Sequence, residues 1–160
     1  MKIIRLVAVM AATAGLMISQ APLASEVTYR EHIAPIFEQQ CAACHGVESP
    51  TLGAFKENSD YYESQNIGPQ MAGYAKLTSF VVWPETGALM RRLDDGSYSG
   101  GAPGNMYQYL GATDEERQEN FATIKAWIGG DDAWYLNRWN ARGDVPAVTK
   151  EQIDSLAVKY

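Results

Sequence analysis

Residues 41–45 read Cys41-Ala42-Ala43-Cys44-His45, which places two thiols three positions apart and a histidine directly after them. On a helical turn, positions i and i+3 share a face, so Cys41 and Cys44 can reach the two vinyl groups of one porphyrin. His45 can then turn its imidazole towards the iron. The pattern is typical of covalent haem attachment through two thioethers, with the histidine as one axial ligand.

Two other uses of a Cys-x-x-Cys pair find less support in the chain. A structural zinc site needs four ligands, and His32 is the only histidine or cysteine outside this motif. A thioredoxin-like redox pair needs a βαβ setting, whereas the residues before Cys41 have the apolar spacing of a helix. We therefore expect one covalent haem c.

The N-terminus has the order of a secretory signal. Two basic residues precede an apolar run over residues 6–18, and small residues follow at Ala24 and Ser25. The apolar run is too short for a membrane span, and no later stretch approaches about 20 apolar residues. We predict a signal peptide over residues 1–25 and a periplasmic mature protein without stable membrane insertion.

Removal of this leader takes away two basic residues and no acidic ones. The mature chain then carries 11 basic and 19 acidic residues, a net charge of −8. Phosphate backbones and anionic membranes repel such a surface, which argues against binding of nucleic acid. A charged partner would instead present a basic docking patch.

Helix start signals stand at Thr28, Thr113 and Thr149, each followed three residues later by Glu or Gln. After Thr113 the apolar residues keep helical spacing up to a glycine pair at 129–130, which predicts the best-defined helix of the chain. Residues 86–93 predict a short helix ended by an Asp-Asp-Gly turn. Residues 46–67 are polar and lack periodicity, and we interpret them as a loop that contains short structure.

This order of features resembles the class I cytochrome c family, monohaem electron carriers built from a few helices around one haem. The resemblance covers roughly residues 27–130. It implies a mainly α fold around one covalent haem, with residues 46–67 as an insertion after the haem motif. The expected organisation is a signal peptide, a cytochrome c domain over 26–130, and a C-terminal tail over 131–160 that packs on the domain or on a partner.

The resemblance also assigns roles to the segment around Gly68-Pro69. In the family, the proline carbonyl after this glycine accepts a hydrogen bond from Nδ1 of the proximal histidine, so Pro69 would orient His45. Such an acceptor fixes the imidazole ring and raises its basicity as a ligand. Met71 takes the place of an apolar residue that packs on the haem.

The candidates for the sixth iron ligand are few. Three of the six methionines lie in the leader, which leaves Met71, Met90 and Met106. Met71 and Met90 have the positions of core residues, whereas Met106 lies in a glycine-rich loop before the C-terminal helix, where the family places its ligand. We predict Met106 as the ligand, with Met90, His32 or an open sixth position as the alternatives.

An iron with both axial positions filled has nowhere to bind a substrate, so the leading function is transport of single electrons between redox partners. One alternative is a fixed haem subunit of a periplasmic oxidoreductase, with residues 46–67 and the tail at the interface. The other is a haem enzyme or gas-binding protein, which requires an open or displaceable sixth site.

Overall fold

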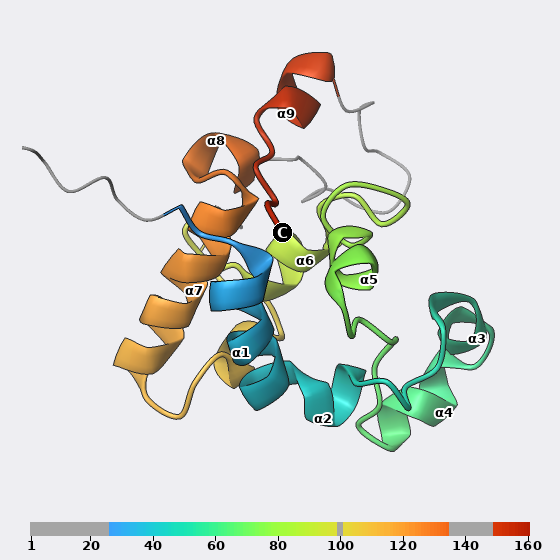
Figure 1. Cartoon of the computed structure of the whole chain (residues 1–160). Helices are drawn as coiled ribbons and strands as arrows, with labels where there is room; N and C mark the ends of the chain where they lie inside the picture. Colours follow the sequence, from blue (N-terminus) through green and yellow to red (C-terminus); the bar gives the residue numbers. More distant parts are fainter. Residues whose placement is uncertain (1–25, 99–100, 135–148) are drawn as a thin grey trace, which may run out of the picture.

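The structure is a computed structural model that describes residues 26–98, 101–134 and 149–160. Within these ranges the chain forms helices and loops and no strands (Figure 1), which confirms the prediction of a mainly α fold. None of the described helices has the length and apolar character needed to cross a membrane. The predicted signal peptide over residues 1–25 lies outside the described residues.

The N-terminal part of the domain is one helical run of four pieces. They are η1 (Tyr29–Ile33), α1 (Ala34–Ile36), η2 (Phe37–Cys41) and α2 (Ala42–His45), where η1 and η2 are π-helical turns. Thr28 caps the run, because its hydroxyl oxygen accepts a hydrogen bond from the Glu31 N–H at 3.3 Å. Pro35 has no N–H to donate, which interrupts the regular α-helical pattern. The run carries the haem motif at its C-terminal end.

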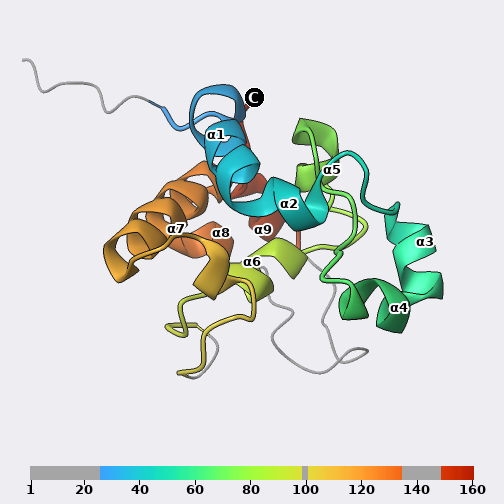
Figure 2. The same cartoon turned by 90° about the horizontal axis from the view of Figure 1, so that it is seen from below.

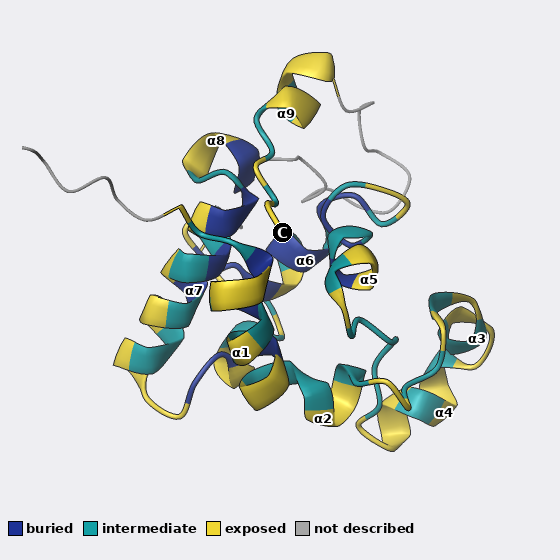
Figure 3. Cartoon of the chain, in the orientation of Figure 1, coloured by how far each residue is buried: buried dark blue, intermediate teal, exposed yellow. Residues whose placement is uncertain are grey.

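The core lies where this run meets the later helices. Of these, α7 (Asp114–Ile128) is the longest in the described parts of the chain, and it buries Phe121, Ile124, Trp127 and Ile128. The other helices of this body are α5 (Tyr74–Thr78), α6 (Ala88–Leu93), η3 (Tyr107–Tyr109) and α8 (Asp131–Trp134). Buried residues gather on α6, α7 and α8 (Figure 3), and the start of the N-terminal run, η1, packs against α7.

Three of the predicted helices are confirmed. The Thr113 hydroxyl accepts from the Glu116 N–H at 3.2 Å to start α7, and Gly129, at φ 133°, follows its end. Helix α6 begins two residues later than the predicted start at 86, because Gly87 before it has a left-handed backbone. The final helix, α9 (Lys150–Asp154), has the complete capping box that Thr149 predicts.

The short structure expected within the loop over residues 46–67 consists of two helices, α3 (Leu52–Glu57) and α4 (Ser59–Ser64). Thr51 caps α3, and the rings of Phe55 and Tyr62 stack at 6.0 Å between the two helices. The helices project from the body as a small lobe (Figures 1 and 2) and contain no buried residue. Each has six residues, too few to show helical periodicity in the sequence.

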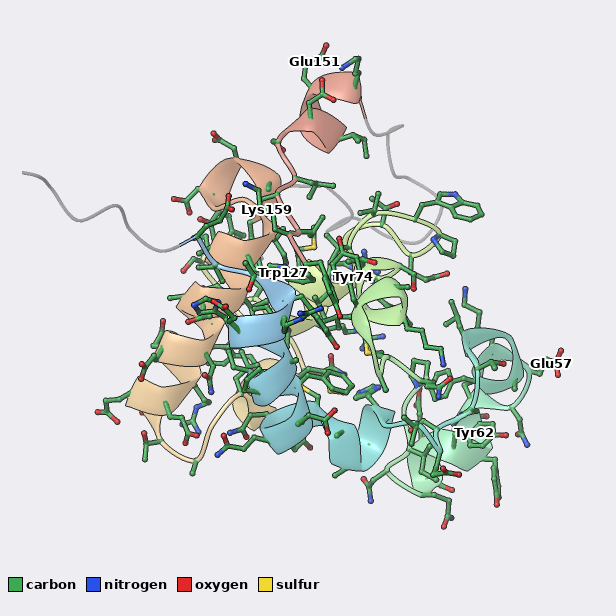
Figure 4. The ribbon with its side chains drawn as sticks, in the orientation of Figure 1. Glu57, Tyr62, Tyr74, Trp127, Glu151 and Lys159 are labelled. Carbon is green, nitrogen blue, oxygen red and sulfur yellow. The ribbon has the colours of Figure 1, made fainter. Side chains whose placement is uncertain are left out.

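The described parts of the C-terminal tail pack on the domain. The carbonyl of Lys159 accepts from the backbone N–H of Tyr29 at 2.7 Å and from the Trp127 indole at 2.8 Å. The carbonyl of Val158 accepts from the Tyr74 hydroxyl at 2.6 Å. Figure 4 shows Tyr74, Trp127 and Lys159 close to the end of the chain. The last residues thus join η1, α5 and α7.

Candidate haem site

The haem motif occupies the last turns of the N-terminal run. Helix α2 contains Cys44 and His45, and Cys41 is the residue before it. The Cys44 side chain is exposed, whereas Cys41 and His45 are half-buried. No disulfide joins Cys41 and Cys44, so both sulfurs are available for thioethers.

The motif is hydrogen-bonded to the Gly68-Pro69 segment. The N–H of Gly68 donates to the Cys44 carbonyl at 2.8 Å, and the N–H of Met71 donates to the His45 carbonyl at 2.9 Å. Between them, His45 Nδ1 lies 2.8 Å from the carbonyl oxygen of Pro69. That oxygen can only accept, so Nδ1 carries the proton and Nε2 keeps the lone pair that a metal needs.

Gly68 lies against the face of the imidazole. A Cβ atom built on Gly68 would come within 2.0 Å of His45 Cε1 and 2.5 Å of Nδ1. No side chain fits in that space. The sequence pattern identified Gly68 only as the neighbour of Pro69, and the signal for its packing role is this close approach of backbone to ring.

Burial sets the protonation state of the motif. It lowers the pKa of His45, and the nearby Arg92 guanidinium lowers it further, against the opposing effect of the Pro69 hydrogen bond. Burial also raises the pKa of the Cys41 thiol to about 11. The imidazole is therefore held in the neutral form that can ligate iron.

An apolar cavity adjoins the motif. Cys41 lines it together with apolar side chains from the N-terminal run, α5, α6 and α7: Ile33, Ile36, Phe37, Leu77, Leu89, Leu93 and Ile124. A porphyrin is a flat apolar body that needs such a lining. The cavity itself is small, about 20 Å³, and its lining includes neither His45 nor Met106. The fit to a haem therefore rests on the two thiols and the oriented imidazole.

The three methionines outside the predicted leader have different surroundings. Met90 is fully buried on α6, among the core residues. Met71 and Met106 are half-buried and pack against that core from segments outside the helices. Met106 precedes η3, and its N–H donates to the Arg92 carbonyl at 2.9 Å. Met106 is thus on a loop anchored to the end of α6.

His32 lies near the other end of the N-terminal run from His45. Its Nδ1 accepts a hydrogen bond from the Thr28 N–H at 3.1 Å. At the α-helical rise, 13 residues correspond to roughly 20 Å along the axis. His32 is accordingly a residue of the first helical turn rather than part of the haem motif.

One residue of this region was missed by the sequence analysis, which interpreted residues 94–96 only as a turn. Asp94 is fully buried, and its carboxylate accepts hydrogen bonds from the Trp134 indole N–H at 3.1 Å and the Gly96 N–H at 3.0 Å. An aspartate in a turn signal is normally exposed, so only the tertiary structure reveals it.

A profile of the PccH cytochrome c family matches residues 28–160. The chain belongs to this family. A solved structure, the monohaem cytochrome PccH from Geobacter sulfurreducens, is 46% identical and has a TM-score of 0.73. The match covers 84% of this chain and 99% of that one.

Membership of the family confirms the predictions of a monohaem c-type cytochrome and of one covalently bound haem c. Membership of a monohaem cytochrome c family supports a haem-based electron carrier. The match also runs to residue 160, so the tail belongs to the conserved unit of this family, beyond the 27–130 range of the predicted resemblance.

A second similarity has a narrower extent. Proteins named dihydroxy-acid dehydratase from two strains of Nitratidesulfovibrio vulgaris, DP4 and Hildenborough, are 30% identical over 93 residues. That segment is 58% of this chain, and the chain spans only 17% of the length of those proteins. The similarity assigns no dehydratase activity to this chain.

Proposed function

We propose that this protein carries single electrons between redox partners in the periplasm, through a haem c with histidine and methionine ligands. In this proposal Cys41 and Cys44 form the thioethers, and His45 and Met106 are the axial ligands. Pro69 orients His45, and Met71 packs on the haem. Such a haem exchanges one electron with little rearrangement and offers no substrate a place at the iron.

The observation that carries the proposal is the contact between His45 and Pro69. The 2.8 Å separation of Nδ1 and the carbonyl oxygen directs the unprotonated Nε2 away from Pro69, on the helix end that also bears both thiols. The acceptor increases the basicity of the imidazole and prevents it from rotating. These properties support a permanent proximal ligand.

Two observations support Met106 as the other ligand. The side chain is half-buried against the core, and its backbone is tied to α6 through the Arg92 carbonyl. Methionine sulfur favours ferrous iron and so raises the reduction potential. Met90, by comparison, is fully enclosed by core residues on α6.

The proposal is tested on the purified native protein by spectroelectrochemical titration and by carbon monoxide binding. A single one-electron transition, with slow carbon monoxide binding to the ferrous form, supports an electron carrier with a filled sixth site. Rapid binding of carbon monoxide would contradict it and would favour a haem enzyme or gas-binding protein.

Export is part of the proposal and rests on the predicted leader over residues 1–25. N-terminal sequencing of the protein from the periplasmic fraction should give a start near Glu26. Recovery of the chain with Met1 in the cytoplasmic fraction would contradict export, and it would also remove the setting in which haem c is normally attached.

The α3–α4 lobe favours a second candidate, a fixed haem subunit of a periplasmic oxidoreductase. Tyr61 on α4 is 56% exposed, and exposed tyrosines are common at the centres of interfaces. Trp134 of the tail is fully buried within its own domain and does not serve as such an anchor. Size-exclusion chromatography of the native extract distinguishes the two: a free monomer supports the carrier, and a stable complex supports the subunit.

A further inference from the structure

Asp94 is a fully buried carboxylate at the end of α6, outside the haem motif. One oxygen, Oδ1, accepts from the Trp134 indole N–H at 3.1 Å. The other, Oδ2, accepts from the backbone N–H groups of Gly96 at 3.0 Å and Tyr98 at 3.4 Å. A buried charge is costly unless it is hydrogen-bonded in this way, so these contacts specify one conformation of the turn.

Asp94 also binds the C-terminal end of the loop that begins after α6. Its backbone carbonyl accepts from the Gly104 N–H at 2.8 Å, two residues before Met106. The Arg92 carbonyl accepts from the Met106 N–H at 2.9 Å, next to that contact. Asp94 therefore fixes where the chain leaves α6 and where it returns with Met106.

We propose that Asp94 is a positioning residue that keeps the Met106 loop closed over the sixth coordination site. The inference rests on the proposed ligation by Met106. Through Trp134, the carboxylate also attaches the loop to α8. If the loop opened, the turn would move away from the buried Asp94 carboxylate. The carboxylate would then lose hydrogen bonds that the protein interior cannot replace.

The affinity of the ferric protein for added imidazole measures how far the Met106 loop is closed. Imidazole binds ferric iron only when the methionine has left, so its apparent affinity is the intrinsic affinity scaled by the fraction of open loop. A variant with a looser loop binds imidazole more tightly. A change that only weakens the whole fold lowers the unfolding midpoint in denaturant and leaves the imidazole affinity unchanged, because the unfolded fraction stays negligible in water.

The test compares three variants of the haem-loaded protein. Asp94→Asn places an amide among N–H donors, and we expect its imidazole affinity to rise about tenfold or more. Trp134→Phe keeps the carboxylate and removes one donor, with a smaller rise of about threefold. Asp60→Asn is the matched control, because Asp60 is an exposed aspartate on α4, in the lobe that projects away from this loop; its affinity should stay unchanged.

The outcomes separate this inference from the proposed ligation. Tighter imidazole binding in Asp94→Asn and Trp134→Phe, with Asp60→Asn like wild type, supports the positioning role. The near-infrared sulfur-to-iron charge-transfer band of the ferric protein reports a bound methionine. If wild type shows this band, but Trp134→Phe or a folded Asp94→Asn binds imidazole like wild type, the positioning role of Asp94 is wrong and ligation by Met106 stands. If wild type lacks the band, Met106 is not the ligand and both fail. Should Asp94→Asn not fold, the Trp134→Phe result decides.

Discussion

The two sides of the proposed iron site are built differently. On the His45 side, the ligand belongs to a continuous helical run, and Cys44 and His45 together are joined to residues 68–71 by three hydrogen bonds of 2.8 to 2.9 Å. On the Met106 side, the ligand belongs to an irregular loop held by two backbone carbonyls and by the buried carboxylate of Asp94.

The difference indicates which side opens first. A helix-borne ligand moves only if the helix itself frays, whereas a loop opens when a few contacts break. We therefore expect His45 to stay bound under all conditions in which the protein is folded, and ligand exchange to occur at the Met106 position.

Loss of a thioether is the largest change. Cys41→Ala or Cys44→Ala should weaken or abolish haem attachment, because each removes one covalent bond to the porphyrin. Mass spectrometry of protein matured with a haem-attachment system measures the outcome. Ala43→Ser, which alters an exposed residue between the thiols, is the control and should attach haem fully. A mature wild-type protein with the mass of the bare polypeptide would contradict the account.

Removal of the loop ligand comes next. Met106→Ala should abolish the sulfur-to-iron band of the ferric protein, lower the reduction potential and accelerate carbon monoxide binding to the ferrous iron by about tenfold or more. Met71→Leu and Met90→Leu are the controls and should keep the band, because leucine fills a packing site of similar size. A band that survives in Met106→Ala and vanishes in Met90→Leu would make Met90 the ligand.

Crowding of the imidazole tests the His45 side. Gly68→Ala places a Cβ within 2.0 Å of His45 Cε1, and the ring or the backbone must move. We expect a loss of about 2 kcal/mol in the free energy of unfolding. Gly53→Ala is the matched control, because its Cβ meets no atom within 4 Å and it lies on α3. Equal stability of the two variants in denaturant would show that the contact is unimportant.

Screening of surface charge should have the smallest effect. The net charge of −8 expected after removal of the predicted leader predicts that electron transfer to a basic partner slows as ionic strength rises, because salt weakens long-range attraction. Stopped-flow kinetics at increasing salt measures this. A rate independent of salt would indicate apolar docking and would strengthen the fixed-subunit alternative.

The features that the sequence predicted are those with local causes. The haem motif, the cap and stop of α7 and the capping box of α9 each depend on residues within one or two helical turns. The burial of Asp94 depends on Trp134, 40 positions away, and the seating of the tail depends on contacts between Lys159 and the first helix. Such contacts leave no periodic signal in the sequence.

The most direct test of the ligand assignment is the proton NMR spectrum of the ferrous protein with labelled methionine methyl groups. The mature chain has three such groups, from Met71, Met90 and Met106. A methyl on a sulfur bound to the iron lies over the porphyrin face, where the ring current shifts its resonance far upfield. The account predicts one such resonance, lost in Met106→Leu. A far-upfield resonance that persists in Met106→Leu, or its absence from the wild-type spectrum, would contradict ligation by Met106.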